Sequence, residues 1–487
     1  RRPSATARSK CANAQRNSHV RPEPVLPIVQ ELQQSIREDL AGQFAGEFRF
    51  DRLTREIYAS DGSLYQLCPV GVAYPRSLED LVVLARYAEE HSLALVPRGA
   101  GSGVAGGALG TGLIVDCSRH LTNIVSIGDD TVTVEAGVVR DQLNRVLRQR
   151  GRYLAPDPAN AEVTTIGGML GVDAAGSHAV RVGSMRDHVQ NIQIVLPGGH
   201  AFLAGIEPIR DPLHASAGSP EHNGESVKHG IVGRLARLLQ QHAALIRERQ
   251  PPLMRNCSGY HLRTVLAGNA LNLPRLLVGS EGTLALFASA TLDTSPLPVQ
   301  RGVALLLYGS LESAIRTVQA VNDQQPTACD LLDRRLLTLA READAGFEAI
   351  IPKTAEAGLI VEQAGFSERQ VKDRMRMIID AARAQESQVI VAQQVIEGWH
   401  AMRLRVAGGC RRKAAGQHHA KQVCRVCHQH RAIADQCRVR AGLAFANLAV
   451  VDLPHRCHLG GGPGEEHLVG EIELVARKGR LLDLDAE

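Results

Sequence analysis

Aromatic side chains are scarce in this 487-residue sequence, where Phe, Tyr and Trp make up 3% of the residues. Proteins that bind single-stranded nucleic acid stack bases on aromatic rings, so this scarcity argues against a nucleic-acid partner. No stretch reaches the roughly 18 uninterrupted apolar residues of a membrane span. The first 25 residues are basic but lack the apolar core of a secretory signal. We therefore expect a cytoplasmic protein with at most peripheral association at the inner face of a membrane.

A dense cysteine framework and a strong charge of one sign are also lacking. The ten cysteines are mostly scattered, unlike those of a disulfide-rich secreted domain, so a reducing compartment is expected. The formal net charge is only +4. With 44% hydrophobic and 22% charged residues the composition is that of a globular protein. The length exceeds what one hydrophobic core usually fills, which predicts two or more domains.

The N-terminal part shows several secondary-structure signals. Residues 1–25 are predicted to be a disordered basic arm, and residues 26–68 a helical lead-in with Ile28, Leu32 and Ile36 at helical spacing. After Pro69, the segment Ser77-Leu-Glu-Asp80 resembles a capping box. The helix that it predicts has an apolar stripe of Leu81, Leu84, Ala85 and Ala88.

The most informative segment is rich in glycine and follows a predicted strand, Leu93-Ala-Leu-Val96. It reads Pro97-Arg-Gly-Ala-Gly-Ser-Gly-Val-Ala-Gly-Gly107, and the predicted strand Leu113-Ile-Val-Asp-Cys117 follows. Because glycine has no Cβ, successive backbone N–H groups can converge on one anion, such as a diphosphate. Gly101 to Gly106 match G-x-G-x-x-G, but the NAD-binding version needs a helix opening at the third glycine. The spacing leaves no room for that helix, so we predict a strand–loop–strand anion site, with a plain flexible turn as the alternative.

A second stretch of small residues follows the alternating strand Thr131-Val-Thr-Val-Glu135 and a predicted helix from Gln142 to Arg150. The stretch contains Pro156-Asp-Pro158, Thr164-Thr-Ile-Gly-Gly168, Gly171, Ala174-Ala-Gly-Ser177 and Arg181-Val-Gly183. Small side chains allow the backbone to approach a flat and bulky ligand. The strand Ile192-Gln-Ile-Val-Leu196 comes next.

Beyond Pro296 the pattern predicts a further alternation of strands and helices. Val303-Ala-Leu-Leu-Leu-Tyr308 is typical of a strand, and Leu311, Ile315, Val318 and Val321 predict a helix stripe.

Four motifs in order resemble one family. They are Pro97-Arg-Gly-Ala-Gly-Ser-Gly103, Pro156-Asp-Pro158 with Thr165-Ile-Gly-Gly168, Arg181-Val-Gly-Ser-Met-Arg-Asp-His188, and Leu276-Leu-Val-Gly-Ser-Glu-Gly-Thr-Leu284. The chain resembles FAD-linked oxidases of the vanillyl-alcohol-oxidase superfamily, in the branch of D-2-hydroxyacid dehydrogenases, D-lactate dehydrogenases and glycolate oxidase flavoprotein subunits. The phrase Arg255-Asn-Cys-Ser-Gly-Tyr260 is similar to larger members that carry an appended iron–sulphur domain.

The resemblance implies an α+β fold with a two-subdomain FAD-binding module of the PCMH type and a partial, ferredoxin-like substrate-cap domain. The implied ranges are 69–205 and 206–296 for the two FAD-binding subdomains and 297–400 for the cap. The implied FAD-contacting residues are Pro97, Arg98, Gly99, Ala100, Gly101, Ser102, Gly103, Gly106, Gly107, Pro156, Thr165, Gly167, Gly168, Gly171, Asp187, Ile194, Val195, Glu281 and Gly282. Where many members have Asn after the paired glycines, this chain has Met169. The Gly-rich loop contains no His for covalent attachment, so FAD is expected to bind non-covalently.

The implied reaction is oxidation of a D-2-hydroxy acid, of the D-lactate, glycolate or D-2-hydroxyglutarate class, to the 2-oxo acid. Such chemistry needs a cation for the carboxylate and a base for the hydroxyl proton. The candidates are Arg255, Asn256, Tyr260 and His261, although core packing is an equal or better explanation of the last two. Electrons would pass to a quinone, a cytochrome or an iron–sulphur protein.

Residues 401–487 form an unassigned tail rich in basic residues, Cys and His. Residues 401–450 hold ten Lys and Arg against one acid, Asp435. Cys424, Cys427, His428, His430 and Cys437 have zinc-like spacing, but no paired second half follows, so no metal site is assigned. The patterning is lost near Met402, which favours an out-of-frame translation over a zinc or nucleic-acid-binding tail. The family's C-terminal Asn-x-His motif was not found, so a catalytically incomplete FAD-binding remnant is the alternative function.

Overall fold

The computed structural model describes residues 27–209, 223–250, 252–253, 258–343, 345–385 and 390–397. None of the helices in these ranges is long and apolar enough to cross a membrane. The chain divides into two compact units that join between Ala41 and Gly42. The first unit contains helix α1 (Pro27–Asp39), which the spacing of Ile28, Leu32 and Ile36 predicts. All other elements belong to the second unit.

The first sheet of the second unit has four strands in the order β1-β2-β4-β3. Its strands are β1 (Glu47–Arg49), β2 (Gly71–Tyr74), β3 (Leu95–Arg98) and β4 (Leu113–Asp116). Strands β2, β3 and β4 are parallel, and β1 is antiparallel to β2. Helix α2 (Arg52–Tyr58) follows β1. The predicted helical lead-in therefore also contributes a strand to this sheet.

Helix α3 (Leu78–Glu90) connects β2 to β3 and begins as its sequence predicts. The Ser77 side chain accepts a hydrogen bond from the Asp80 amide, and Leu81, Leu84, Ala85 and Ala88 are all buried. The Asp80 carboxylate accepts hydrogen bonds from the amides of Ala45 and Arg76, each at 2.7 Å, instead of returning to Ser77. The capping signal thus also fixes the chain before α3.

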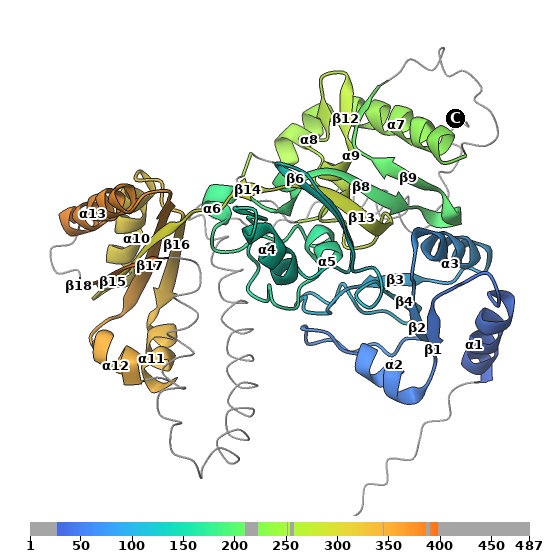
Figure 1. Cartoon of the computed structure of the whole chain (residues 1–487), viewed down its shortest axis with the longest axis horizontal. Helices are drawn as coiled ribbons and strands as arrows, with labels where there is room; N and C mark the ends of the chain where they lie inside the picture. Colours follow the sequence, from blue (N-terminus) through green and yellow to red (C-terminus); the bar gives the residue numbers. More distant parts are fainter. Residues whose placement is uncertain are drawn as a thin grey trace, which may run out of the picture. The chain divides into compact units, whose positions relative to one another are not determined.

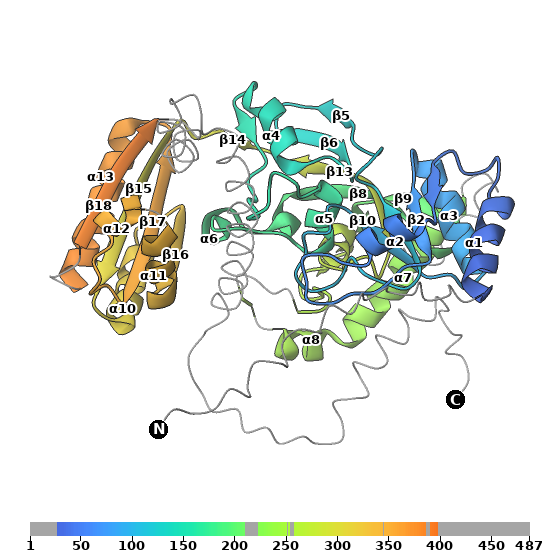
Figure 2. The same cartoon turned by 90° about the horizontal axis from the view of Figure 1, so that it is seen from below.

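The second sheet is antiparallel and has the order β5-β6-β13-β8-β9 (Figures 1 and 2). Its strands are β5 (Ile124–Ile127), β6 (Thr131–Glu135), β8 (Val189–Val195), β9 (Ala201–Ala204) and β13 (Leu286–Asp293). Strand β13 pairs with both β6 and β8. The predicted boundary at residue 205 therefore does not separate two sheets, because a strand from 206–296 lies in the middle of this one.

Short elements and helices surround the second sheet. They are α4 (Arg140–Arg148), β7 (Arg152–Tyr153), α5 (Ile166–Gly171), α6 (Ala179–Val182), the 3₁₀ helices η1 (Met185–His188) and η2 (Pro197–Gly199), β10 (Ile206–Pro208), α7 (Asn223–Gln241), α8 (Ala243–Arg249), β11 (Leu266–Ala267), β12 (Ala270–Asn272), α9 (Leu273–Leu277) and β14 (Ser295–Pro296). Leu143 and Leu147 of α4, Ile166 of α5 and Val232 of α7 share one hydrophobic core with the sheet. This core places α4, which precedes the second glycine-rich stretch, and α5, which lies within it.

The C-terminal part of the described chain is a four-stranded antiparallel sheet with helices on both faces. Its elements are β15 (Gln300–Tyr308), α10 (Leu311–Asn322), β16 (Ala328–Asp333), α11 (Arg334–Ala343), α12 (Ala345–Ile350), β17 (Ala357–Gly365), α13 (Glu368–Gln385) and β18 (Ile390–Glu397). The strand order β16-β17-β15-β18 with this alternation is the ferredoxin-like arrangement that the sequence predicts for the cap domain.

The predicted stripe of α10 is partly wrong. Leu311 and Ile315 are exposed, and the buried face consists of Ser313, Ala314, Thr317 and Val321. Helix α10 packs closely beside α13 and over the sheet. Small residues suit such a close approach. The spacing of the large apolar residues therefore predicted a different face of α10 from the one that is buried.

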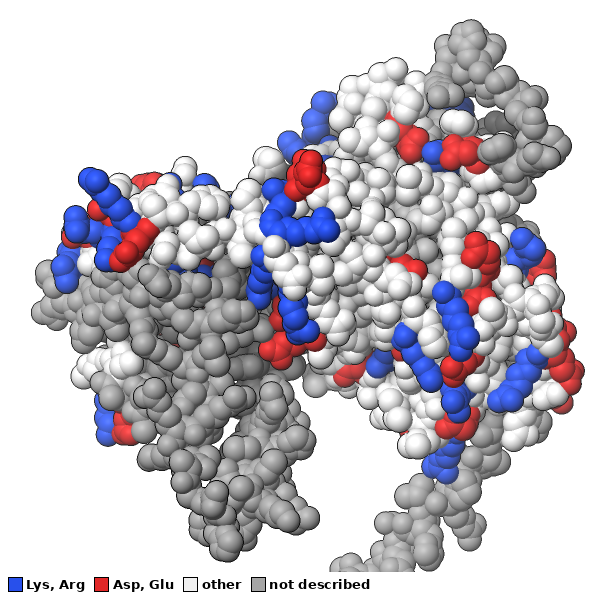
Figure 3. Space-filling model, viewed as in Figure 1, with Lys and Arg blue, Asp and Glu red and all other residues white. Residues whose placement is uncertain are grey.

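Charges of both signs are interspersed on the face of the molecule shown in Figure 3. On β1, Glu47 lies 3.7 Å from Arg49, 3.6 Å from Arg76 and 3.3 Å from Arg119. Exposed pairs of this kind contribute little to stability. They do place one acidic side chain among three basic ones.

We predict that Asn144→Ala destabilises the protein through a single buried amide. Asn144 is fully buried; its Oδ1 accepts from the Leu154 amide at 2.7 Å and its Nδ2 donates to the Leu154 carbonyl at 3.0 Å. Arg140 also donates to that carbonyl, so the substitution leaves mainly the amide without a partner. The free energy of unfolding should fall by about 1–3 kcal/mol in urea denaturation. The exposed Asn123→Ala is the control, and equal effects of the two would contradict this role.

Candidate functional site

The glycine-rich loop connects two parallel strands, β3 and β4, without an intervening helix, as predicted. Gly101 and Gly106 have φ values of +64° and +82°, which disfavour other residues. No backbone amide from Gly99 to Ala108 donates a hydrogen bond to another group within the described ranges. None of residues 99–108 is buried, so these amides are open to water or to a bound anion.

Arg98 fixes this loop through backbone carbonyls. Its guanidinium donates to Tyr58 O at 3.0 Å, Ser60 O at 2.7 Å and Ala108 O at 3.4 Å, and it lies over the Tyr58 ring. These contacts engage Arg98 with the protein itself. Any anion in the loop would therefore be held by the backbone, which is the role that the resemblance implies for residues 98–107.

The second glycine-rich stretch is positioned by Arg140 and Thr165. The buried Arg140 donates from Nε to Pro156 O at 3.0 Å and so fixes the Pro156–Pro158 turn. Thr165 is the N-cap of α5, and its hydroxyl accepts from the Gly168 amide at 3.2 Å. The Gly167 amide donates to Ala136 O at 2.7 Å. These bonds place Thr165, Gly167 and Gly168 at the edge of the second sheet.

A tight turn from Gly279 to Thr283 forms the third part of the site. Glu281 has a φ of +53°, and its amide donates to Gly171 O at 2.9 Å. Arg186 pairs with Asp173 at 2.9 Å and donates to Val278 O at 2.8 Å, next to this turn. Both charged side chains are buried, so the pair holds η1, the end of α5 and the turn together.

The three segments meet at their glycines. A Cβ on Gly99 would lie 2.1 Å from Thr165 Oγ1, one on Gly282 would lie 2.3 Å from Pro97 Cγ, and one on Gly107 would lie 3.1 Å from Glu281 Oε2. We call the segments 97–107, 165–171 and 281–282 the glycine platform. Residues that the sequence analysis selected from separate motifs therefore lie together, with a glycine against a side chain at each of these contacts.

The chain around Gly62 also belongs to this site, although the sequence analysis did not select it. The Gly62 amide donates to Gly101 O at 2.9 Å, and a Cβ on Gly62 would lie 2.9 Å from the carbonyls of Ser102 and Gly103. A Cβ on Gly106 would lie 3.0 Å from the Tyr65 ring. The segment begins with three turn-forming residues, Asp61-Gly-Ser63, and that weak signal was available in the sequence.

Three predicted FAD-contacting residues outside the platform have other contacts. Asp187 accepts from the Ser184 amide at 3.0 Å and lies 3.6 Å from Arg275, so it caps η1. Ile194 and Val195 are buried on β8, which pairs with β13 on one side and β9 on the other. Met169 is also buried in the core. A contact of these three predicted residues with the cofactor stays a prediction.

The predicted catalytic residues are only partly described. Arg255, Asn256 and the Cys/His-rich tail lie outside the described residues. The Tyr260 hydroxyl lies 2.7 Å from Thr283 Oγ1, which brings it to the turn of Glu281 and Gly282. His261 Nε2 lies 2.7 Å from Thr264 Oγ1. Burial and the nearby Arg186 and Arg275 lower the pKa of His261, which favours a neutral imidazole.

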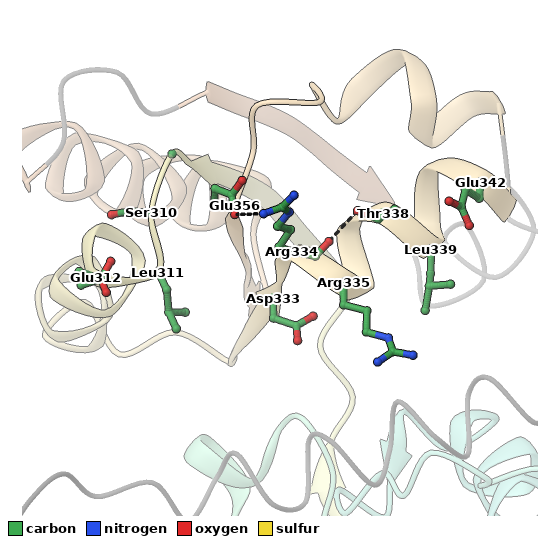
Figure 4. Close-up of a pocket in the computed structure, with 11 residues that line it drawn as sticks. Ser310, Leu311, Glu312, Asp333, Arg334, Arg335, Thr338, Leu339, Glu342 and Glu356 are labelled. Carbon is green, nitrogen blue, oxygen red and sulfur yellow. Dashed lines mark hydrogen bonds and ion pairs between the residues drawn. The ribbon is translucent and has the colours of Figure 1, made fainter.

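A hollow of about 810 Å³ lies on the cap domain, apart from the platform (Figure 4). It is lined by residues at the start of α10, by α11 and by Glu356, which forms an ion pair with Arg334 at 3.5 Å. None of its lining residues belongs to the glycine platform. The site is therefore defined by the platform and not by this hollow.

The platform fits a flavin dinucleotide by its donors and its lack of side chains. A diphosphate needs several N–H donors, which the amides of residues 99–108 provide. A flat ring system needs backbone without bulky side chains, which Gly167, Gly168 and Gly171 provide. A Cβ on Gly171 would meet nothing within 4 Å, so space is present beside α5.

Comparisons with known proteins agree with this site. Residues 69–204 match the FAD binding domain family, and residues 297–455 match the C-terminal domain of FAD linked oxidases. The second match extends past residue 400, where the sequence analysis ended the cap domain. The chain is 34% identical over 413 residues to D-2-hydroxyglutarate dehydrogenase of Escherichia coli (strain K12), covering 80% of this chain and 39% of that relative.

Other relatives have related names. Glycolate oxidase subunit GlcD of Bacillus subtilis (strain 168) is 27% identical, covering 70% of this chain and 62% of that protein. The solved structure of an alkyldihydroxyacetonephosphate synthase matches with a TM-score of 0.52 at 16% identity, covering 74% of this chain and 60% of that chain, which shows a shared fold. The chain spans about two fifths of the length of the Escherichia coli relative.

Motifs, fold and both domain matches point to the same family. The FAD binding domain match covers the loop between β3 and β4, the Pro156 turn, α5 and β8. The second match begins just before β15 and contains the whole ferredoxin-like domain. The chain therefore belongs to the FAD-linked oxidases of the vanillyl-alcohol-oxidase superfamily, whose cofactor is FAD.

Proposed function

We propose that this chain holds FAD non-covalently on the glycine platform and oxidises a D-2-hydroxy acid to the 2-oxo acid. The observation that carries the proposal is the run of amides from Gly99 to Ala108 without acceptors, brought against α5 and the Glu281 turn. The relatives named above are a D-2-hydroxyglutarate dehydrogenase and a glycolate oxidase subunit, which supports this substrate class.

The platform would hold the diphosphate mainly through backbone N–H donors. The Arg98 guanidinium donates to carbonyl oxygens, and it also lies against Gly101, where a Cβ would be 2.5 Å from its Nη2 atom, so its positive charge is beside this end of the loop. Glu281 places a carboxylate beside Gly107, and a carboxylate repels a phosphate. We therefore assign the diphosphate to the Gly99–Gly103 end of the loop and the flavin ring to the backbone of residues 165–171. When bound, FAD supplies a hydride acceptor at its N5 atom.

The substrate side needs a group that takes the hydroxyl proton. We assign this role to His261, because its lowered pKa keeps the imidazole able to accept a proton near neutral pH. Its Nδ1 atom has no hydrogen-bond partner among the described residues, whereas Nε2 is held by Thr264. Tyr260, fixed by Thr283, would orient the substrate at the turn. Arg255 and Asn256 remain the predicted carboxylate ligands.

The electron acceptor and location complete the proposal. We assign the acceptor to the class of quinones, cytochromes or iron–sulphur proteins, since the relatives include dehydrogenases. The location is proposed as cytoplasmic, with at most peripheral contact with a membrane.

The central test is reduction of the bound flavin. Purified protein should show flavin absorbance, and D-2-hydroxyglutarate, D-lactate or glycolate should bleach it under anaerobic conditions. The L-enantiomers of the first two acids serve as controls. Bound flavin that no 2-hydroxy acid bleaches would instead support a catalytically incomplete FAD-binding remnant. Absence of bound flavin after reconstitution with FAD would contradict the assigned cofactor site.

Gly282→Ala should raise the Kd for FAD by about tenfold or more. A tenfold rise corresponds to a loss of about 1.4 kcal/mol of binding free energy. The new methyl group would lie 2.3 Å from Pro97 Cγ and push the turn away from β3. Gly151→Ala is the matched control, because Gly151 also has a positive φ of +68° but nothing within 4 Å of its Cβ position. FAD titration of both apoproteins measures the difference, and equal losses would show that strain at φ alone is responsible.

His261→Gln should slow substrate-dependent flavin reduction by about a hundredfold or more, the usual contribution of a general base. FAD content should stay at the wild-type level. The exposed His242→Gln is the control. Stopped-flow absorbance measures the reduction rate, and an unchanged rate in His261→Gln would assign the base elsewhere.

A further inference from the structure

His178 contacts carboxylates of both the FAD-binding part of the chain and the cap domain. His178, at the start of α6, has Nδ1 at 2.5 Å from Asp157 Oδ2 and Nε2 at 2.8 Å from Glu362 Oε1. Asp157 follows Pro156 in the second glycine-rich stretch, whereas Glu362 is on β17 of the cap. The His178 side chain is only 13% exposed and that of Glu362 only 9%. The contact is thus a largely buried bridge between two domains.

The cap presents a polar end of its sheet to this histidine. Successive residues of a strand point to opposite faces. Ala304 and Leu306 of β15 and Leu359 and Val361 of β17 pack in the core with α10 and α13, so Arg301 and Glu362 lie on the opposite face. Arg301 Nε lies 3.0 Å from the same Glu362 oxygen. Asp330 of β16 shares this face and hydrogen-bonds Ser177, next to His178.

The geometry determines the proton count of His178. A neutral imidazole has one N–H and one lone pair, so it can donate to only one of two flanking carboxylates. Donation to both Asp157 and Glu362 requires both ring nitrogens to be protonated. Burial alone would lower the pKa of His178, but the hydrogen bonds and charges of Asp157 and Glu362 outweigh it and raise the pKa to about 9.

The other charged groups around the bridge fit an imidazolium. Arg301 faces Glu362 from β15, and burial raises the pKa of Asp330 on β16 and that of Tyr153 on the FAD-binding side. Both shifts favour the uncharged forms. The cations of His178 and Arg301 then balance the anions of Asp157 and Glu362. Within the described ranges, no group of His, Cys, Asp and Glu side chains is arranged to hold a metal ion.

We propose that His178 is the positioning residue that seats the cap domain on the FAD-binding part of the chain, and that it does so only as an imidazolium. A neutral ring would turn a lone pair towards one of the two carboxylates, and that carboxylate would lose its hydrogen bond to the ring. The contact between the two domains would then weaken at α6 and β16, which lie against each other. The proposal concerns the docking of two domains. It rests on the proposed function only for the measurement of flavin reduction.

The pH dependence follows from the raised pKa of His178. On undocking, the ring loses Glu362 but keeps Asp157 beside it, so the pKa of His178 falls below the docked value of about 9. The stabilisation of docking is therefore present at lower pH and is lost as the pH rises through about 9. Arg301 keeps its charge throughout this range, so the histidine is the group that changes.

The test is hydrogen–deuterium exchange of the full-length, FAD-loaded protein from about pH 6 to about pH 10, corrected for the intrinsic rate. In the wild type, exchange in Ala179–Val182 and Ala328–Asp333 should increase by at least about tenfold over this range, the equivalent of one pKa unit. Val189–Val195, in the middle of the second sheet, should not change and reports that the fold persists.

Two variants separate charge from packing. In His178→Phe a ring remains but donates no hydrogen bond, so both carboxylates lose their shared donor and the two segments should exchange quickly at every pH. In Asp157→Asn the amide can donate to the ring, so a neutral His178 still bridges to Glu362, and exchange should be slow and independent of pH. A pH-independent wild type, or an Asp157→Asn profile like that of the wild type, would overturn the proposal.

The exchange measurement needs no turnover. Its result can therefore support the role of His178 even when no 2-hydroxy acid reduces the flavin. It can also contradict that role when one does. Where the proposed function holds, flavin reduction should lose rate with the same pH profile in the wild type and become flat in Asp157→Asn.

Discussion

Close approach of backbone to neighbouring groups is the constraint on which this site depends. Gly99 lies against Thr165, Gly282 against Pro97 and Gly107 against Glu281, and at the first two positions a Cβ would overlap an existing atom. The three segments come from the first sheet, from α5 beside the second sheet, and from the turn before β13. At each contact a glycine lies directly against a side chain of another segment, so the amides of the β3–β4 loop come close to the start of α5. A cofactor with a charged diphosphate and a flat ring suits such a surface.

Arginines, two of them buried and Arg98 half-buried, hold these irregular segments in place. Arg98, Arg140 and Arg186 each donate to main-chain carbonyls of a loop or turn. Loops without helix or strand partners leave carbonyl groups that need donors, and the five N–H groups of a guanidinium can serve several at once. Lysine could not reproduce this geometry, because its donors lie on a single nitrogen. The main chain of the platform and of the segments beside it is therefore held by arginine side chains.

Local signals in the sequence predicted local structure well. The Ser77 cap, the stripe of α3, strand β6 and the strand–loop–strand form of the glycine loop were all predictable, because each depends on neighbouring residues. The stripe of α10 was partly wrong, since its contact with α13 selects small residues. The packing of Gly62 on Ser102 depends on contacts between distant segments, and no period or spacing encodes it. The four family motifs located the platform, but only the fold shows that Arg98 faces the protein.

The position of β13 has a consequence for how the protein is made. Residues 286–293 pair with β6 and β8, although the ribosome delivers them long after both. Until they emerge, the facing edges of these two strands have unsatisfied hydrogen-bonding groups, and such edges invite pairing with other chains. The second sheet is therefore completed late in synthesis by a non-local step, and the nascent chain is most exposed to aggregation just before that step.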